Sequence, residues 1–476
     1  MKKRKTAMLC AMLLLTAIPA GCSGGGAGGG VSKPADLDPK NFVSAEKFIT
    51  IADLPPNPFE SLEVYSSLGL SGYILTQDYC DFTRDGKITD SYKNAIQRAG
   101  DSGLDVYIRN HYNDPDYFVN DDDVTLRGQF GAGETSGNVY TLPKRNITTE
   151  FKDFPAVKGF YMADEPVYDN LFAYGKLIDW YNTYYSDSFF HMNLFPSYAT
   201  AKSLAYHGYN EYVNAYITEI AGKVKGKKSI CLDNYPFSND SPNPIRPSYF
   251  SDLLMVACAA KDYNASAPVG DKGYMGICIQ TFKNPGIKDI TSAAQISFQL
   301  CTGMAVGSKV FEYFSYNSAA NFGIYGIMQS GSKRIYDYVK EANDGYLGFA
   351  EVVNAFEWQG VRTFSAAESK NSENEESFAA VSELLIKNVG VLDCEKTSSR
   401  LDSMVGCFKK GDTDGYMVVN CADPSKERVN NVTLSFKNCS EALVYTEGMK
   451  VEKVKLADGC LRLALGAGEG AFVIPA

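Results

Sequence analysis

Short apolar runs alternate with longer stretches of helical spacing through most of the chain. The runs are rich in β-branched and aromatic residues, which favours strands, and the stretches between them favour amphipathic helices. Parallel strands need such alternation, because a helix usually connects each strand to the next. The pattern predicts an α/β fold whose eight strands lie at residues 48–53, 72–77, 105–110, 158–164, 188–194, 228–234, 273–281 and 308–315.

The number of these units indicates the architecture. Eight strand and helix pairs over about 300 residues fit a (β/α)8 TIM barrel better than an open doubly wound sheet. From about residue 356 the pattern changes to short alternating runs separated by Gly, Asp and Asn, as at 415–420 and 442–445. This later pattern predicts a small antiparallel β-sandwich. We expect the barrel at residues 42–355 and the sandwich at 356–476.

The first residues have the pattern of an export signal. Four basic residues at 2–5 precede an apolar stretch at 7–18, and Cys22 comes shortly after it. The segment resembles the signal of bacterial lipoproteins, in which this cysteine is lipidated after cleavage. The resemblance implies a signal at 1–22, a lipid anchor on Cys22 and an extracytoplasmic location on the bacterial cell membrane. The glycine-rich residues 23–41 would form a flexible tether.

Composition narrows the partners. The net charge is −10, and no basic cluster comparable to that of the signal recurs, so we expect no nucleic acid partner. The chain has only three histidines, so a three-histidine metal site would need all of them. No glycine-rich dinucleotide or phosphate loop follows any predicted strand. We therefore expect neither a metal nor a cofactor.

The fourth predicted strand ends in the sequence Ala-Asp-Glu-Pro at 163–166. Pro166 cannot donate to a neighbouring strand, so the strand stops there. Its acidic pair, Asp164 and Glu165, is expected at the carboxyl edge of the sheet, where α/β barrels build their active sites. Alternatively, the pair caps the next helix.

The alternation of side chains along a barrel strand predicts which residues point inward. In the sixth strand the bulky Ile230 and Leu232 should meet the helices, which directs Asp233 into the barrel. The same reasoning brings five polar side chains to one mouth of the barrel: Glu165, Asn193, Asp233, Gln280 and Glu312.

Three inward carboxyl groups suit glycoside hydrolysis, in which one protonates the leaving oxygen and another acts as nucleophile or base. Three tyrosines beside them, Tyr235, Tyr313 and Tyr316, are placed to stack on sugar rings. Alternatively, the inward acids hold substrate hydroxyls or pair with Arg109.

Residues 159–166, at the end of the fourth strand, are similar to the corresponding segment of the (β/α)8 glycoside hydrolases of the retaining superfamily that includes family 42 β-galactosidases. Those enzymes carry their acid/base Glu there, commonly as Asn-Glu-Pro. The helix at 295–303 and the strand leading into Tyr313 and Phe314 resemble the last helix and closing strand of the same enzymes. The resemblance covers roughly residues 45–350 and implies carbohydrate as the substrate.

This resemblance implies that Glu165 is the general acid/base. Asp164 replaces the Asn that holds the sugar 2-hydroxyl in the superfamily, and Gln280 stands where the nucleophilic Glu is expected. A glutamine cannot form the glycosyl ester, so Glu312 or Asp233 has to supply the second carboxylate.

We expect a surface-anchored glycoside hydrolase that acts on extracellular oligosaccharides, with Glu165 and Glu312 as its catalytic residues. The alternative is a catalytically degenerate barrel that serves as a glycan-binding lipoprotein. The predicted substrate-binding residues are Asp164, Asn193, Asp233, Tyr235, Gln280, Tyr313, Tyr316 and His111.

Overall fold

The structure is a computed structural model of the 476-residue chain, which divides into residues 1–34 and a compact unit that begins at Ala35. The structure describes residues 36–76, 87–109, 124–127, 139–142, 150–175, 178–239, 242–320, 323–328, 333–364, 394–399 and 401–476. All of these residues belong to the compact unit.

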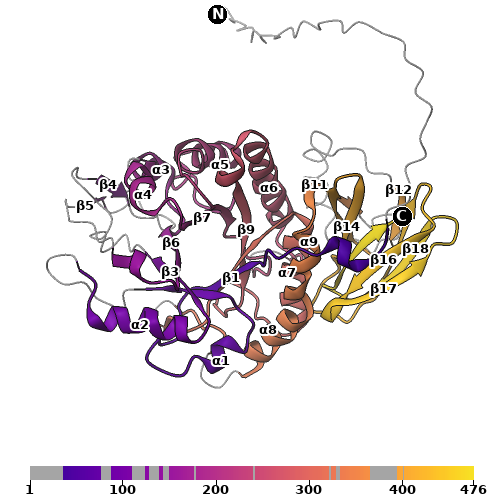
Figure 1. Cartoon of the computed structure of the whole chain (residues 1–476), viewed down its shortest axis with the longest axis horizontal. Helices are drawn as coiled ribbons and strands as arrows, with labels where there is room; N and C mark the ends of the chain where they lie inside the picture. Colours follow the sequence, from indigo (N-terminus) through magenta and orange to yellow (C-terminus); the bar gives the residue numbers. More distant parts are fainter. Residues whose placement is uncertain are drawn as a thin grey trace, which may run out of the picture. The chain divides into compact units, whose positions relative to one another are not determined.

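Eight parallel strands close into a barrel, as the sequence predicted (Figure 1). The last strand pairs with the first, with Ile49 opposite Val310, so the parallel sheet has no open edge. In chain order the strands are β1 (Ile49–Ala52), β2 (Gly72–Leu75), β3 (Asp105–Arg109), β6 (Val157–Ala163), β7 (Phe189–Leu194), β8 (Lys228–Leu232), β9 (Gly273–Gln280) and β10 (Val310–Phe314).

Amphipathic helices cover the outside of the barrel. In α2 the buried residues Tyr92, Ala95, Ile96 and Ala99 recur at helical spacing, and the Thr89 side chain caps the first turn. The α-helices are α1 (Glu63–Ser66), α2 (Asp90–Asp101), α3 (Tyr168–Gly175), α4 (Ile178–Tyr185), α5 (Tyr209–Tyr216), α6 (Ser248–Ser266), α7 (Ala293–Ala305), α8 (Lys333–Tyr346) and α9 (Ala350–Val353). Shorter turns are the 3-10 helices η1 (Pro39–Phe42), η3 (Glu150–Asp153), η5 (Val269–Asp271), η7 (Leu347–Phe349) and η9 (Glu447–Met449), and the π-helix η4 (Ile217–Ala221). None of the described helices is long and apolar enough to cross a bilayer.

The C-terminal part consists of antiparallel sheets, also as predicted (Figure 1). A six-stranded sheet and a three-stranded sheet enclose an apolar core that includes Val418, Leu434 and Val473. The six-stranded sheet has the order β11 (Glu357–Phe364), β13 (Ser403–Lys410), β14 (Thr413–Asn420), β19 (Gly470–Pro475), β16 (Glu441–Thr446) and β17 (Lys450–Lys455). The three-stranded sheet has the order β12 (Cys394–Ser399), β15 (Asn430–Phe436) and β18 (Cys460–Leu465), and β4 (Val124–Arg127) pairs with β5 (Val139–Leu142).

Helix α7 lies between the barrel and the six-stranded sheet. Every residue from Gln295 to Ala305 is buried, because the helix contacts β9 on one side and β13 and β14 on another. The Trp358 indole donates a hydrogen bond of 2.9 Å to the carbonyl oxygen of Ala305, where the helix ends. Both sides of α7 are therefore apolar core.

The barrel interior is layered. One layer is apolar and contains Ile51, Ile74, Tyr107, Phe189 and Val310. The next inward positions along the strands are polar, among them Asp53, Arg109, His191 and Glu312. This change of polarity places the candidate site at the carboxyl ends of the strands.

Candidate active site

An arginine at the end of β3 joins two carboxylates at the barrel mouth. Arg109 Nη1 lies 2.5 Å from Asp53 Oδ2, directly after β1, and Arg109 Nη2 lies 3.3 Å from Asp164 Oδ2, directly after β6. The Tyr161 hydroxyl donates a hydrogen bond of 2.7 Å to Asp164 Oδ1. The guanidinium carbon also lies 4.9 Å from the centroid of the Tyr161 ring. These contacts fix the Asp164 carboxylate on both oxygens.

Asp164 reaches the barrel axis because the end of β6 is irregular. The register between β6 and β7 shifts between Tyr161 and Ala163, and Glu165 adopts a φ of 45°, which is unusual for a residue with a side chain. The Glu165 amide donates to the Asn193 carbonyl oxygen at 3.1 Å. Strict alternation placed Asp164 on the face opposite Glu165. The hydrogen bond to the inward Tyr161 brings Asp164 into the site instead.

Glu165 is half-buried at the same edge of the sheet. Burial chiefly raises the pKa of Tyr235, and the carboxyl groups of Asp233 and Glu165 contribute to the increase. Glu165 therefore lies within electrostatic range of the loop after β8, where Asp233 is located.

Asp233 follows β8 and is only 8% exposed. Among the described residues no side chain or backbone donor reaches its Oδ1 atom. Burial raises the pKa of Asp233 well above its usual value, and the Asp164 carboxylate adds to this effect, whereas the Tyr235 hydroxyl opposes it. Burial of this kind favours the protonated form of a carboxyl group.

Glu312 lies deeper in the barrel than the mouth. It is fully buried, and its Oε2 lies 2.6 Å from His191 Nε2, whose Nδ1 lies 2.7 Å from Ser229 Oγ. Burial raises the pKa of Glu312 well above its usual value and lowers the pKa of His191 to about 3. Burial therefore favours the neutral form of each group. The Asn193 side chain opposes the rise in the pKa of Glu312. No hydrogen bond to Glu312 Oε1 is formed by the described residues.

His191, Cys231 and Glu312 also form the one group of described residues whose ligand atoms could surround a metal ion, since these atoms lie within 4.8 Å of one another. The short contact between His191 Nε2 and Glu312 Oε2 already pairs two of the three atoms. A hydrogen-bonded network explains this cluster without an ion.

Gln280 and Asn193 point inward, as predicted, and both hold other parts of the site. Gln280 Oε1 accepts from the Phe237 amide at 3.1 Å, and its Nε2 donates to the carbonyl oxygens of Phe237 and Lys288. Asn193 Nδ2 donates to the Tyr161 hydroxyl at 3.1 Å. The Gln280 amide is therefore engaged in holding the loops after β8 and β9 together.

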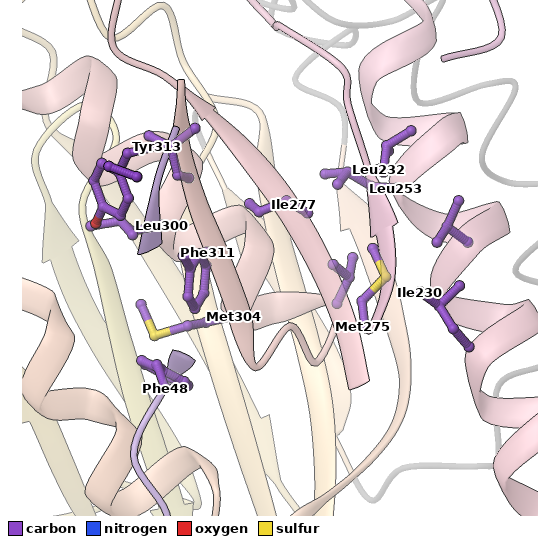
Figure 2. Close-up of a cluster of buried hydrophobic side chains, with 14 of the residues drawn as sticks. Phe48, Ile230, Leu232, Leu253, Met275, Ile277, Leu300, Met304, Phe311 and Tyr313 are labelled. Atoms are coloured by element: carbon purple, nitrogen blue, oxygen red, sulfur yellow. The ribbon is translucent and has the colours of Figure 1, made fainter. Parts of the chain in front are cut away.

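Two of the predicted sugar-stacking tyrosines are buried away from the mouth. Tyr313 packs with Leu300 and Phe311 outside the barrel strands, and its hydroxyl donates to Asn343 at 2.7 Å (Figure 2). The prediction for Tyr313 is wrong because it neighbours the inward Glu312 and so points outward. The ring of Tyr316 is 4.9 Å from that of Tyr65 and is buried, so the prediction for Tyr316 is wrong because the ring packs against α1.

Tyr235 is half-buried beside Asp233, with its ring edge-on to that of Phe282 at 4.9 Å. His111 and Cys22 lie outside the described residues. Asp53 and Tyr161 belong to the site although neither was predicted there, and Arg109 was expected only as a pairing partner. Asp53 has the same signal in the sequence as Asp233, an acid directly after an apolar strand.

Asp252 on α6 holds the loops after β7 and β8. Its Oδ2 accepts from the Ser197 amide at 2.9 Å and from Asn234 Nδ2 at 2.8 Å. Burial raises the pKa of Asp252 to about 6, although the Ser197 and Asn234 donors oppose the increase. Asn234 is the neighbour of Asp233, so this buried carboxyl group fixes the position of the site.

We expect Asp252→Asn to remove a pH dependence of stability. The folded chain binds the Asp252 proton more tightly than the unfolded chain, so this group favours folding at pH 4 and disfavours it above pH 6. Relative to wild type, the variant should gain up to about 3 kcal/mol of unfolding free energy as the pH rises from 4 to 7. Urea unfolding of both proteins across this range measures the difference. A difference that stays constant with pH would contradict the prediction.

Comparisons with known proteins give distant structural likenesses. No family model matches the chain, and no curated protein sequence matches it. The α-amylase of Geobacillus thermoleovorans in complex with acarbose aligns with a TM-score of 0.47 and 10% identity, covering 90% of this chain and 98% of the amylase. An Anoxybacillus α-amylase aligns with a TM-score of 0.44 and 13% identity, covering 87% and 88%. The α-L-arabinofuranosidase of Thermotoga maritima gives 0.41 and 10%, covering 89% and 92%.

All three of these proteins are enzymes that act on carbohydrates, and all three TM-scores are below 0.5. At such low identity the likeness concerns the fold alone. Fold also does not determine function, so the activity has to be inferred from the residues of the site.

Proposed function

We propose that the protein is a glycoside hydrolase whose reacting groups are Asp233 and Asp164. The observation that carries this proposal is the contrast between two carboxyl groups at one barrel mouth. Asp233 is buried, and its raised pKa favours the protonated form, whereas Asp164 accepts hydrogen bonds from a guanidinium and a hydroxyl group. Pairs of acids in such unlike surroundings are typical of acid/base catalysis.

In this mechanism Asp233 protonates the glycosidic oxygen as the bond to the anomeric carbon breaks. The Oδ1 atom meets no donor among the described residues, so no hydrogen bond within the described part of the chain competes with the substrate oxygen for it. Asp164 either attacks the anomeric carbon directly or removes a proton from the attacking water. Arg109 and Tyr161 hold the Asp164 carboxylate in place through both reactions.

Glu312 and Glu165, which the sequence predicted to be catalytic, have other roles in this proposal. Glu312 is fully buried and bonded to His191, so it supports the site and does not touch substrate. Glu165 lies at the same edge as Asp164 and contributes a third carboxyl group to the mouth. The proposal retains an extracellular oligosaccharide as the substrate and a lipid anchor on Cys22.

The alternative proposal is a glycan-binding lipoprotein without catalytic activity. Two observations favour it: the seventh barrel strand ends in Gln280, whose amide holds loop backbone, and the only acid of the eighth strand, Glu312, is buried. Neither strand therefore offers an accessible carboxyl group to a substrate.

Incubation of the full-length protein with a panel of aryl glycosides and oligosaccharides tests both proposals. Released sugar is measured, and binding of the same compounds is followed by calorimetry. Asp233→Asn protein, purified identically, serves as the blank for contaminating hydrolases. Hydrolysis by wild type alone would support the enzyme. Binding without hydrolysis would support the binding protein. If the protein neither hydrolyses nor binds any of these compounds, both proposals are contradicted.

A further inference from the structure

We propose that Tyr198, supported by Arg246, forms a binding platform for a second sugar ring of an oligosaccharide beside Asp233. This inference rests on the proposed function and names the substrate class: a chain of at least two sugars, one of which presents an apolar C–H face. Tyr198 follows β7 and is 42% exposed, whereas Tyr161 and Tyr235 are more covered.

A guanidinium group covers one side of the Tyr198 ring. The Arg246 Cζ atom lies 3.7 Å from the ring centroid, which is a close cation–π contact. Despite this contact, 42% of the surface of Tyr198 remains exposed. Aromatic rings with one protected side and one open side suit stacking against the C–H bonds of a sugar.

The platform is tied to the loop that carries Asp233. Arg246 Nε donates to the Tyr235 carbonyl oxygen at 3.3 Å, and the Arg246 amide donates to the Pro236 carbonyl oxygen at 2.7 Å. Tyr235 is two residues after Asp233. The guanidinium therefore has a fixed place relative to the proposed acid.

A second connection fixes the other end of the platform. The Ser197 amide, next to Tyr198, and the Asn234 side chain, next to Asp233, both donate to the Asp252 carboxyl group. The charged groups of the site also affect the pKa of Tyr198. Burial raises its pKa, Arg246 opposes this effect, and the carboxyl groups of Asp233 and Glu165 add to it. The tyrosine is thus rigidly held within range of both acids.

Other exposed aromatic residues provide a control. Phe172 on α3 is 45% exposed, nearly the same fraction as Tyr198. Its ring lies edge-on to Tyr168 at 5.6 Å. Among the described residues no cation covers this ring, and no hydrogen bond ties it to the loop of Asp233. Removal of Phe172 therefore eliminates a comparable exposed ring without disturbing the proposed platform.

The test measures binding by calorimetry in the full-length Asp233→Asn protein, so that hydrolysis does not consume the ligand. The probes are unmodified oligosaccharides of increasing length and one aryl monosaccharide. Tyr198→Ala should weaken oligosaccharide binding about tenfold and monosaccharide binding less than twofold. Tyr198→Phe should restore binding, and Phe172→Ala should leave it unchanged. Thermal unfolding of each variant confirms that the fold is intact.

Several results would overturn the platform. These are unchanged oligosaccharide binding in Tyr198→Ala, an equal loss in Phe172→Ala, or no binding of any oligosaccharide by the parent. An equal loss for the aryl monosaccharide would assign Tyr198 to an aromatic leaving group instead. If Tyr198→Ala weakens the binding of long oligosaccharides and wild type hydrolyses none of them, only the proposed hydrolase is contradicted. If wild type hydrolyses long substrates and Tyr198→Ala leaves the KM for these substrates unchanged, only the platform is contradicted.

Discussion

Asp233→Asn should lower kcat about 10²- to 10⁴-fold on natural oligosaccharides, because an amide cannot protonate the leaving oxygen. The substitution is isosteric, and no described donor reaches Oδ1, so the fold should be unaffected. Rates are measured with a sugar whose leaving group is another sugar. Retention of full activity would exclude Asp233 as the general acid.

The matched control uses leaving-group acidity. The phenolate of an aryl glycoside with a highly acidic phenol leaves without being protonated. Asp233→Asn should therefore hydrolyse this substrate at a rate close to that of wild type. Asp164→Asn should lose activity on both substrates, because attack on the anomeric carbon is needed in either case. The wild-type rate should also fall as the pH rises through the raised pKa of Asp233, and the variant should lack this decline. Equal losses by Asp233→Asn on both substrates would contradict the assignment.

Arg109→Met should reduce the free energy of unfolding by about 3–5 kcal/mol at neutral pH. Arg109 is the cation paired with Asp53, which is 1% exposed, and the substitution leaves that carboxylate buried without its partner. Asp164 loses the same guanidinium, so activity should fall as well. Denaturant unfolding measures the loss.

Two further variants separate this effect from a general loss of packing. Combining Arg109→Met with Asp53→Asn removes the buried charge and should recover much of the lost stability. Lys340→Met breaks the exposed ion pair with Asp344 and should leave the stability nearly unchanged. If the Asp53→Asn substitution gives no recovery, the ionic explanation fails.

The barrel and the sandwich could be predicted because their strands are local patterns. Each of the eight predicted parallel strands exists, with ends shifted by a residue or two. The positions of such ends depend on tertiary contacts that a single segment does not encode.

The candidate site was predicted only in part, because alternation gives the side of a strand and not the depth of a residue. Glu312 and Asp233 both point inward, but Glu312 is sealed beneath the mouth and Asp233 lies at it. Asp164 enters the site through a register shift between β6 and β7, which depends on two strands at once. Tyr198 lies in a loop, where no periodic pattern marks its exposure.

Helix α7 makes the barrel dependent on the C-terminal part of the chain. Removal of the chain after a point between Val353 and Glu357 would agree with the change of sequence pattern. It would, however, expose to water the apolar face of α7 that contacts β13 and β14. Gln299 on this helix also accepts from the Gln280 amide at 2.7 Å, at the end of β9. The C-terminal sheets therefore cover the outer face of α7, and we expect the smallest piece that folds to include both the barrel and these sheets.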